Sequence, residues 1–197
     1  IAYLHYNGQG VSQDTSQAKS WFEKAADEGH LEAMFNVGIM CDTSQDYEKS
    51  AEWYQKAAEL GHLNAMYNLS IKYLQGKGVP RDDSLAFKWL QGPAENGNAH
   101  AMANLGTMYL NGEGVSRDPS LALSWFERAA ENGDNKAMVK IAIRYMNGDG
   151  VPEDDIKALE WLEKAAEKGS PESMHLIAIT YHRGGNAIDK YMTKAMQ

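Results

Sequence analysis

The apolar residues of this chain recur with the spacing of an α-helix. In the stretch 99–111, residues at offsets 0, 4, 5 and 8 lie on one helical face, and they are Ala101, Leu105, Gly106 and Tyr109. In the stretch 118–132, residues at offsets 0, 3, 4, 7 and 8 form a broad apolar stripe, and they are Ala122, Trp125, Phe126, Ala129 and Ala130. The pattern therefore predicts a pair of helices joined by the glycine-containing turn "GEGV" at 112–115.

This helix pair is repeated along the chain. Trp53, Trp89, Trp125 and Trp161 are each separated by 36 residues, and Trp21 precedes them by a shorter interval of 32. The "G-x-G-V" turn occurs at 8–11, 76–79, 112–115 and 148–151. A methionine column keeps the same register, and it consists of Met34, Met66, Met102, Met138 and Met174. Several columns in one register predict a helix–turn–helix repeat array.

The repeat fixes where helices are expected. First helices are predicted at 31–41, 63–75, 99–111, 135–147 and 171–183. Second helices are predicted at 15–28, 46–60, 82–96, 118–132 and 154–168. Asp118 is expected to cap its helix with Pro119 at the first helical position. We expect the tryptophan column to be buried and the methionine column to belong to the core.

Four departures interrupt the pattern. The segment "DTSQD" at 42–46 replaces a glycine turn and shortens that repeat, so that Cys41 stands where other repeats have Tyr. Pro93, after Gly92, is expected to bend or end its helix. At the two ends, Ile1 aligns with the middle of a first helix, and Tyr191 stands where Trp is expected.

The consensus "A-M-x-x-L-G-x-x-Y-x-x-G-x-G-V-x-x-D", followed by "A-x-x-W-F-x-x-A-A-x-x-G", resembles the Sel-1-like repeat, a relative of the tetratricopeptide repeat. The resemblance implies an all-α fold, a right-handed α/α superhelix of repeats of about 36 residues. It covers one domain, 1–197, with repeats at 1–30 (partial), 31–62 (short), 63–98, 99–134, 135–170 and 171–197 (partial). It also implies a protein-binding adaptor without catalytic residues. Many bacterial members are exported, and some are immunity proteins that neutralise secreted toxins.

The acidic composition of the chain indicates which classes of partner are not expected. The chain has 27 Asp and Glu against 19 Lys and Arg, a net charge of −8. Nucleic acids and anionic membranes require a cationic face, so neither is expected as the main partner. No apolar run is long enough to span a bilayer. The sequence starts without Met or a leader peptide, so any targeting segment is expected to lie outside it.

Each candidate for chemistry has a simpler structural interpretation. No Lys-Ser/Thr follows the "G-x-G-V" turns, so they are not expected to bind phosphate. The aspartate pairs at 82–83 and 154–155 recur in register, which favours helix capping over acid–base catalysis. The segment 147–155 lacks the alternating ligands of a calcium loop, and the chain contains no zinc motif. We therefore expect no enzyme activity, no cofactor and no metal site.

The first helices are expected to line a concave groove, as they do in tetratricopeptide solenoids. Counted from each repeat's alanine, offsets 2, 6 and 9 lie at about 200°, 240° and 180° around the helix, opposite the small-residue stripe. These positions are unusually apolar. The predicted partner-binding groove consists of Tyr3, Phe35, Ile39, Tyr67, Ile71, Leu74, Leu110, Val139, Ile143, Met146, His175 and Ile179.

Two interpretations of this groove remain open. It is either buried between adjacent first helices or exposed to an apolar or amphipathic partner segment. Aromatic Phe35 and Tyr67 would anchor such a segment, and acidic Glu32 and Glu172 on the rim would favour a basic flank. The leading functional prediction is a scaffold that binds a peptide, helix or loop of another protein. The alternatives are an immunity-type protein or a binder of a small ligand or cell-envelope polymer.

Overall fold

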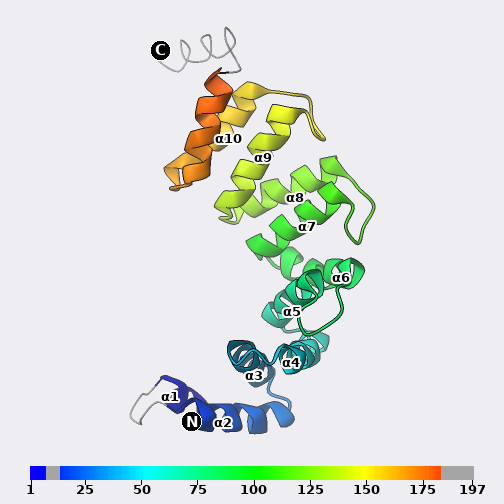
Figure 1. The fold of residues 1–197 in the computed structure, drawn as a ribbon, viewed down its shortest axis with the longest axis vertical. Coiled ribbons are helices and arrows are strands. Elements are labelled where there is room, and N and C mark those ends of the chain that lie inside the picture. Colours follow the sequence, from blue (N-terminus) through cyan, green and yellow to red (C-terminus); the bar gives the residue numbers. More distant parts are fainter. Residues whose placement is uncertain (8–13, 183–197) are drawn as a thin grey trace. The chain divides into compact units, whose positions relative to one another are not determined.

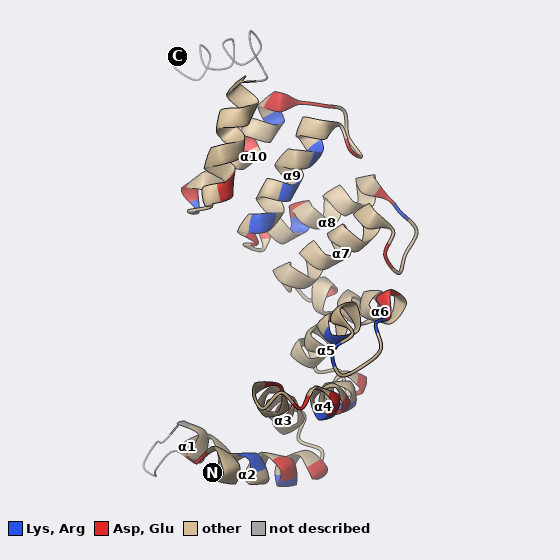
Figure 2. Cartoon of the chain, viewed as in Figure 1, with Lys and Arg blue, Asp and Glu red and all other residues tan. Residues whose placement is uncertain are grey.

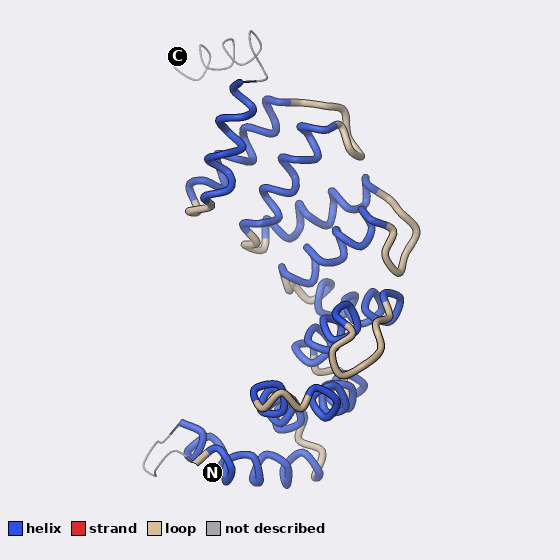
Figure 3. Tube along the Cα trace, in the orientation of Figure 1, coloured by secondary structure: helices blue, strands red, loops and turns tan. Residues whose placement is uncertain are grey.

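The computed structural model describes residues 1–7 and 14–182, and these residues contain helices and turns but no strand (Figures 1 and 3). The helices are α1 (Ala2–Asn7), α2 (Thr15–Asp27), α3 (Leu31–Thr43), α4 (Tyr47–Glu59), α5 (Leu63–Gln75), α6 (Asp83–Glu95), α7 (Ala99–Asn111), α8 (Pro119–Glu131), α9 (Asn135–Asn147) and α10 (Asp155–Glu167). Residues 171–182 are also helical. The predicted helices are confirmed within two residues at each described end. The turn 8–11, residue 183 and Tyr191 lie outside the described residues.

The chain divides into two compact units, residues 1–96 and 97–197. In the first unit, α3 packs against α4 and α5 against α6. In the second unit, α7 packs against α8 and α9 against α10. Each pair is one repeat, so the expected all-α, helix–turn–helix architecture is confirmed. A single domain spanning the whole chain stays a prediction.

Aspartates begin all five second helices. The side chain of Asp118, for example, accepts a hydrogen bond of 2.9 Å from the backbone N–H of Leu121, and Pro119 follows as the first helical residue. The carboxylates of Asp82 and Asp154 cap α6 and α10 in the same way. These caps satisfy backbone donors that the first turn of a helix leaves unpaired. The capping interpretation of the aspartate pairs is thus confirmed.

A glycine in the middle of the first helix lets the two helices of a repeat approach closely. A Cβ placed on Gly106 would lie 2.7 Å from the ring of Phe126, and one on Gly38 would lie 2.5 Å from the ring of Tyr54. In two repeats the equivalent first-helix residue is larger and the second helix carries a leucine instead of an aromatic residue, whereas the first repeat pairs Ala2 with Phe22. These larger pairs are Ser70 with Leu90 and Ala142 with Leu162. Side-chain volumes at the two positions are therefore matched in the four repeats that contain α3 to α10.

The expectation that the tryptophans are buried is wrong. Trp21 is 41% exposed, and Trp53, Trp89, Trp125 and Trp161 are only partly buried. The buried column is the next residue in each second helix: Phe22, Tyr54, Leu90, Phe126 and Leu162, all at most 5% exposed. In four repeats, a Lys or Arg three residues after the tryptophan covers the indole face instead, for example Arg128 at 4.2 Å from the ring of Trp125.

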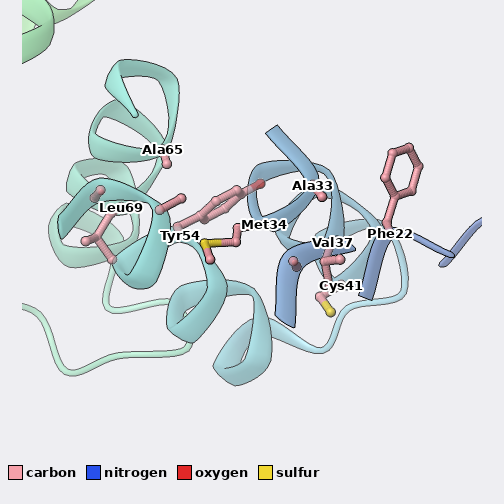
Figure 4. Packing of buried hydrophobic residues seen from close by; sticks show 11 residues of the cluster. Phe22, Ala33, Met34, Val37, Cys41, Tyr54, Ala65 and Leu69 are labelled. Carbon is pink, nitrogen blue, oxygen red and sulfur yellow. The ribbon is translucent and has the colours of Figure 1, made fainter. Parts of the chain in front are cut away.

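The core of the first unit lies between its helices (Figure 4). Phe22 and Tyr54 contribute its largest rings, and Cys41 is 1% exposed within it. The methionine column is mainly core, since Met34, Met102 and Met138 are buried and Met66 is half-buried. Met174 departs from the column and is 59% exposed.

Pro93 does not end its helix, contrary to one of the two outcomes expected from the sequence. α6 continues to Glu95 and has the same 13-residue length as the other second helices. Pro93 is fully buried at the position that alanines hold in the other repeats. It lies in the last turn, where the loss of one N–H donor affects a single helical bond. Gly92 faces Met66, whose Sδ would lie 3.0 Å from an added Cβ.

The "G-x-G-V" turns connect the two helices of one repeat, and two of them also contact the preceding repeat. The first glycine ends a helix in the left-handed region, with φ 75° at Gly112. In the turns at 76–79 and 148–151, the second glycine packs against the first residue of the preceding repeat's second helix. A Cβ on Gly150 would lie 2.7 Å from the backbone of Pro119, and Gly78 approaches the backbone of Tyr47 in the same way. These two turns therefore hold adjacent repeats together, and only a residue without a side chain fits at Gly78 and Gly150.

Candidate partner-binding surface

The predicted groove residues lie at three levels of exposure. Tyr3, His175 and Ile179 are exposed. A larger group is half-buried, and it consists of Phe35, Ile39, Tyr67, Ile71, Leu74, Leu110 and Ile143. These side chains occupy corresponding positions on α3, α5, α7 and α9, so in each unit they form an apolar column that retains contact with solvent.

Two residues of the predicted groove are inaccessible, and this part of the prediction is wrong. Val139 is 3% exposed and Met146 is 6% exposed. Met146 packs in a core cluster with Leu162, and the Thr180 hydroxyl of the following helix lies 3.7 Å from its sulfur. Val139 and Ala103 stand at the repeat position that Phe35 and Tyr67 hold in the first unit. Their side chains are shorter than these aromatic ones, and both are buried.

An aromatic cluster surrounds Phe35 in the first unit. Its ring stacks on the imidazole of His62, with centroids 4.7 Å apart and an interplanar angle of 25°, and its centroid lies 5.8 Å from that of Tyr54. The Nδ1 atom of His62 accepts a hydrogen bond from the backbone N–H of Ala65, so the proton lies on Nε2. This N–H donates to the carboxylate of Glu32 at 3.1 Å. Glu32 is therefore committed to His62 rather than free on the rim.

A polar cluster that the sequence patterns did not indicate lies beside this one. Lys72 is 5% exposed, forms an ion pair with Asp42 of the shortened turn, and lies over the ring of Tyr47 at 4.8 Å. The Tyr54 hydroxyl donates to the same carboxylate at 3.1 Å. Burial, and secondarily the charge of Asp42, raises the pKa of Tyr54. The sequence did contain one sign of this cluster, because Lys72 stands at the repeat position where α7 has the buried Met108.

Acidic Asp149, between the glycines of its turn, has a structural role. Its carboxylate binds Arg144 of its own repeat and Arg117 of the preceding repeat, each at 3.0 Å. The turn's backbone packs on Pro119, and the Ser120 hydroxyl donates to the carbonyl of Gly150 at 3.1 Å. Within residues 1–7 and 14–182, no group of three or more His, Cys, Asp and Glu side chains is arranged to hold a metal ion.

Cavities are found among the described residues of the first unit, and two of them border α2. The larger, about 560 Å³, is lined by Tyr6, Thr15, Ser16, Lys19, Met40, Thr43 and Ser44. It lies at the start of α2, next to the turn that replaces a glycine loop with "DTSQD". The second, about 390 Å³, has an almost wholly apolar lining that includes Tyr3, Trp21 and Phe22. In the part of the chain that the structure describes, no helix is long and apolar enough to cross a bilayer.

Comparisons with known proteins agree on the family. The Sel1 repeat model matches residues 1–30, 31–62, 63–98, 99–134 and 135–170. A Sel1 repeat protein from Oxalobacter formigenes is 31% identical with a TM-score of 0.88, and the match covers 94% of this chain and 78% of that one. Proteins built from Sel1 repeats generally mediate protein–protein interactions. No curated protein matches the chain.

Two further solved structures are similar. A protective antigen of uropathogenic Escherichia coli with an SLR fold is 31% identical with a TM-score of 0.87; the match covers 93% of this chain but only 40% of that one. An immunity protein from Pseudomonas aeruginosa is 21% identical with a TM-score of 0.50, over 87% of this chain and 66% of that one, and this likeness concerns the fold alone. With five matched repeats and relatives at 31% identity, the chain belongs to the Sel1 repeat family.

Proposed function

We propose that the chain is a non-enzymatic scaffold that binds a segment of another protein on the face formed by its first helices. The observation that carries the proposal is the apolar column of half-buried side chains on that face. Ile39, Ile71 and Ile143 occupy the same position in three repeats, and all three remain partly accessible. A monomer that had no use for this column would gain by burying it or by replacing it with polar residues.

The aromatic residues Phe35 and Tyr67 are the proposed anchors in the first unit. Phe35 is held between His62 and Tyr54, so its ring is already ordered before a partner arrives. A pre-ordered aromatic side chain loses little conformational entropy on binding, which is why such residues dominate interface energetics. An apolar or amphipathic segment is the ligand that this surface favours.

Selection from a library of random peptides displayed on phage tests the proposal. We expect the wild-type chain to enrich peptides with apolar residues, and Tyr67→Ala or Ile143→Asp to lose that enrichment while circular dichroism stays unchanged. Ile141→Asp is the matched control, because Ile141 lies on the same helix but is fully buried, and a carboxylate there should unfold the second unit. Failure of the wild-type chain to enrich peptides would contradict the proposal, as would unfolding by Ile143→Asp.

An immunity-type role and the binding of a small ligand or envelope polymer are the alternative functions. The immunity protein from Pseudomonas aeruginosa is 21% identical to this chain, which carries its fold but not its partner. A ligand-binding role would predict a rise in melting temperature with small molecules or cell-wall fragments, together with no peptide enrichment. The apolar column favours the scaffold because in each unit it extends along two helices instead of enclosing one ligand.

A further inference from the structure

Lys140 interrupts a column of asparagines on the first helices. It lies in α9, and the residues at the same repeat position in α3, α5 and α7 are Asn36, Asn68 and Asn104. The helix carries basic side chains at several levels (Figure 2). Lys140 is half-buried and lies three residues before Ile143, hence on the same side of the helix as that part of the apolar column.

The structural task of this position requires no charge. Lys140 Nζ donates a hydrogen bond of 2.7 Å to the Thr107 hydroxyl of the preceding repeat. In the first unit, Asn36 Nδ2 donates a hydrogen bond of 2.9 Å to the hydroxyl of Tyr3, which holds the repeat position equivalent to Thr107. A neutral amide therefore makes the same bond between repeats.

The charge of Lys140 is poorly compensated by the described residues. Its Nζ lies 5.1 Å from the centroid of the Phe126 ring, and no carboxylate of residues 1–7 or 14–182 forms an ion pair with it. Two other basic residues on first helices are paired with carboxylates: the buried Lys72 with Asp42 and the half-buried Arg144 with Asp149. Desolvation by burial lowers the pKa of Lys140, and the Asp134 carboxylate, which contacts His100, offsets this effect only in part.

A half-buried ammonium group with spare donors is a binding group for an anion. We propose that Lys140 Nζ, which is held in place by its hydrogen bond to Thr107, receives an Asp or Glu carboxylate of the bound protein segment, while Ile143 and Leu110 contact the apolar residues beside it. The proposal rests on the scaffold function above and specifies its ligand: in the second unit, an apolar segment that carries one acidic residue. Because the chain has a net charge of −8, the recognition is local and does not depend on long-range attraction.

Peptide selection on two variants tests the assignment. Lys140→Asn installs the residue that three other repeats use, and we expect a melting temperature equal to or above that of the wild type. Lys136→Asn is the matched control, because it removes the same charge from an exposed position one turn away on α9. Peptides selected on the wild type and on Lys136→Asn should be enriched in Asp or Glu next to apolar residues. Those selected on Lys140→Asn should lack the acidic enrichment.

Affinity measurements on a selected peptide complete the test. Replacing its acidic residue by the corresponding amide should weaken binding to the wild type about tenfold and leave binding to Lys140→Asn unchanged. Apolar enrichment without acidic residues, or acidic enrichment that persists on Lys140→Asn, would overturn the assignment and leave the scaffold function standing. If no peptide is enriched on any variant, both proposals fail.

Discussion

Gly106 offers the sharpest test of how the two helices of a repeat pack. In Gly106→Ala, the new Cβ would lie 2.7 Å and 2.8 Å from two ring carbons of Phe126, and 3.0 Å from the carbonyl oxygen of Ala122. Phe126 is fully buried, so its ring has no free space into which it can move. Overpacking of this kind costs about 1–3 kcal/mol, and replacing a helical glycine by alanine returns about 1 kcal/mol. We expect a net loss of up to about 2 kcal/mol.

The second change in this experiment is Phe126→Leu. Alone, it should cost about 1–2 kcal/mol, because it leaves a cavity beside Gly106. Combined with Gly106→Ala, it recreates the pairing of Ala142 with Leu162 in the next repeat, where both residues are fully buried. The double variant should therefore be about 1–2 kcal/mol more stable than the sum of the two single changes predicts.

Urea unfolding followed by far-ultraviolet circular dichroism measures these free energies. Ser70→Ala is the control, because this repeat already pairs a larger residue with Leu90, and we expect a change below about 1 kcal/mol. Additivity of the two changes within about 0.5 kcal/mol would refute the argument that volumes are matched within a repeat. An increase in stability for Gly106→Ala alone would refute the close approach itself.

Three further predictions concern single residues. Phe126→Ala should cost about 3–5 kcal/mol and Trp125→Ala clearly less, about 1–2 kcal/mol, because only Phe126 is fully buried; the reverse order in thermal unfolding would contradict the assigned packing face. Gln45→Gly should stabilise the protein by about 1 kcal/mol, because Gln45 has φ 63°, whereas Ser44→Gly, at φ −84°, should not. Burial raises the pKa of the Cys41 thiol, so its contribution to stability is present below the usual thiol pKa and is lost as pH rises above it. Urea unfolding at neutral and alkaline pH should show a smaller alkaline loss for Cys41→Ala than for the wild type.

The sequence predicted the helix boundaries well because an aspartate precedes each described second helix and a glycine follows shortly after its end. It misassigned the inward residue of the second helices for a physical reason. Trp125 and Phe126 are adjacent and only about 100° apart around the helix, so both lie within the apolar stripe. The structure places the ring of Phe126 in the space beside Gly106, where an added Cβ would lie 2.7 Å from it.

The candidate surface could be predicted only in part. Offsets along the helix identified Ile39, Ile71 and Ile143, but they did not distinguish these residues from Val139 and Met146, which are buried. That difference depends on side-chain length and on the next helix. The break in the asparagine column at Lys140 was visible in the sequence, but its significance depends on the hydrogen bond to Thr107 and on the lack of an ion pair with any described carboxylate.

The glycine turns have a consequence for how the array opens. In a linear repeat protein, stability is a sum of terms for each repeat and for each contact between neighbours. Gly78 and Gly150 stabilise two of those contacts by packing on the preceding repeat. The turn 42–46 contains no glycine, so it lacks the corresponding contact with the start of α2. We therefore expect local unfolding to begin at α2, whose backbone amides should exchange with solvent before those of α4. The shortened turn makes the first repeat the part of this unit that can detach while the others stay folded.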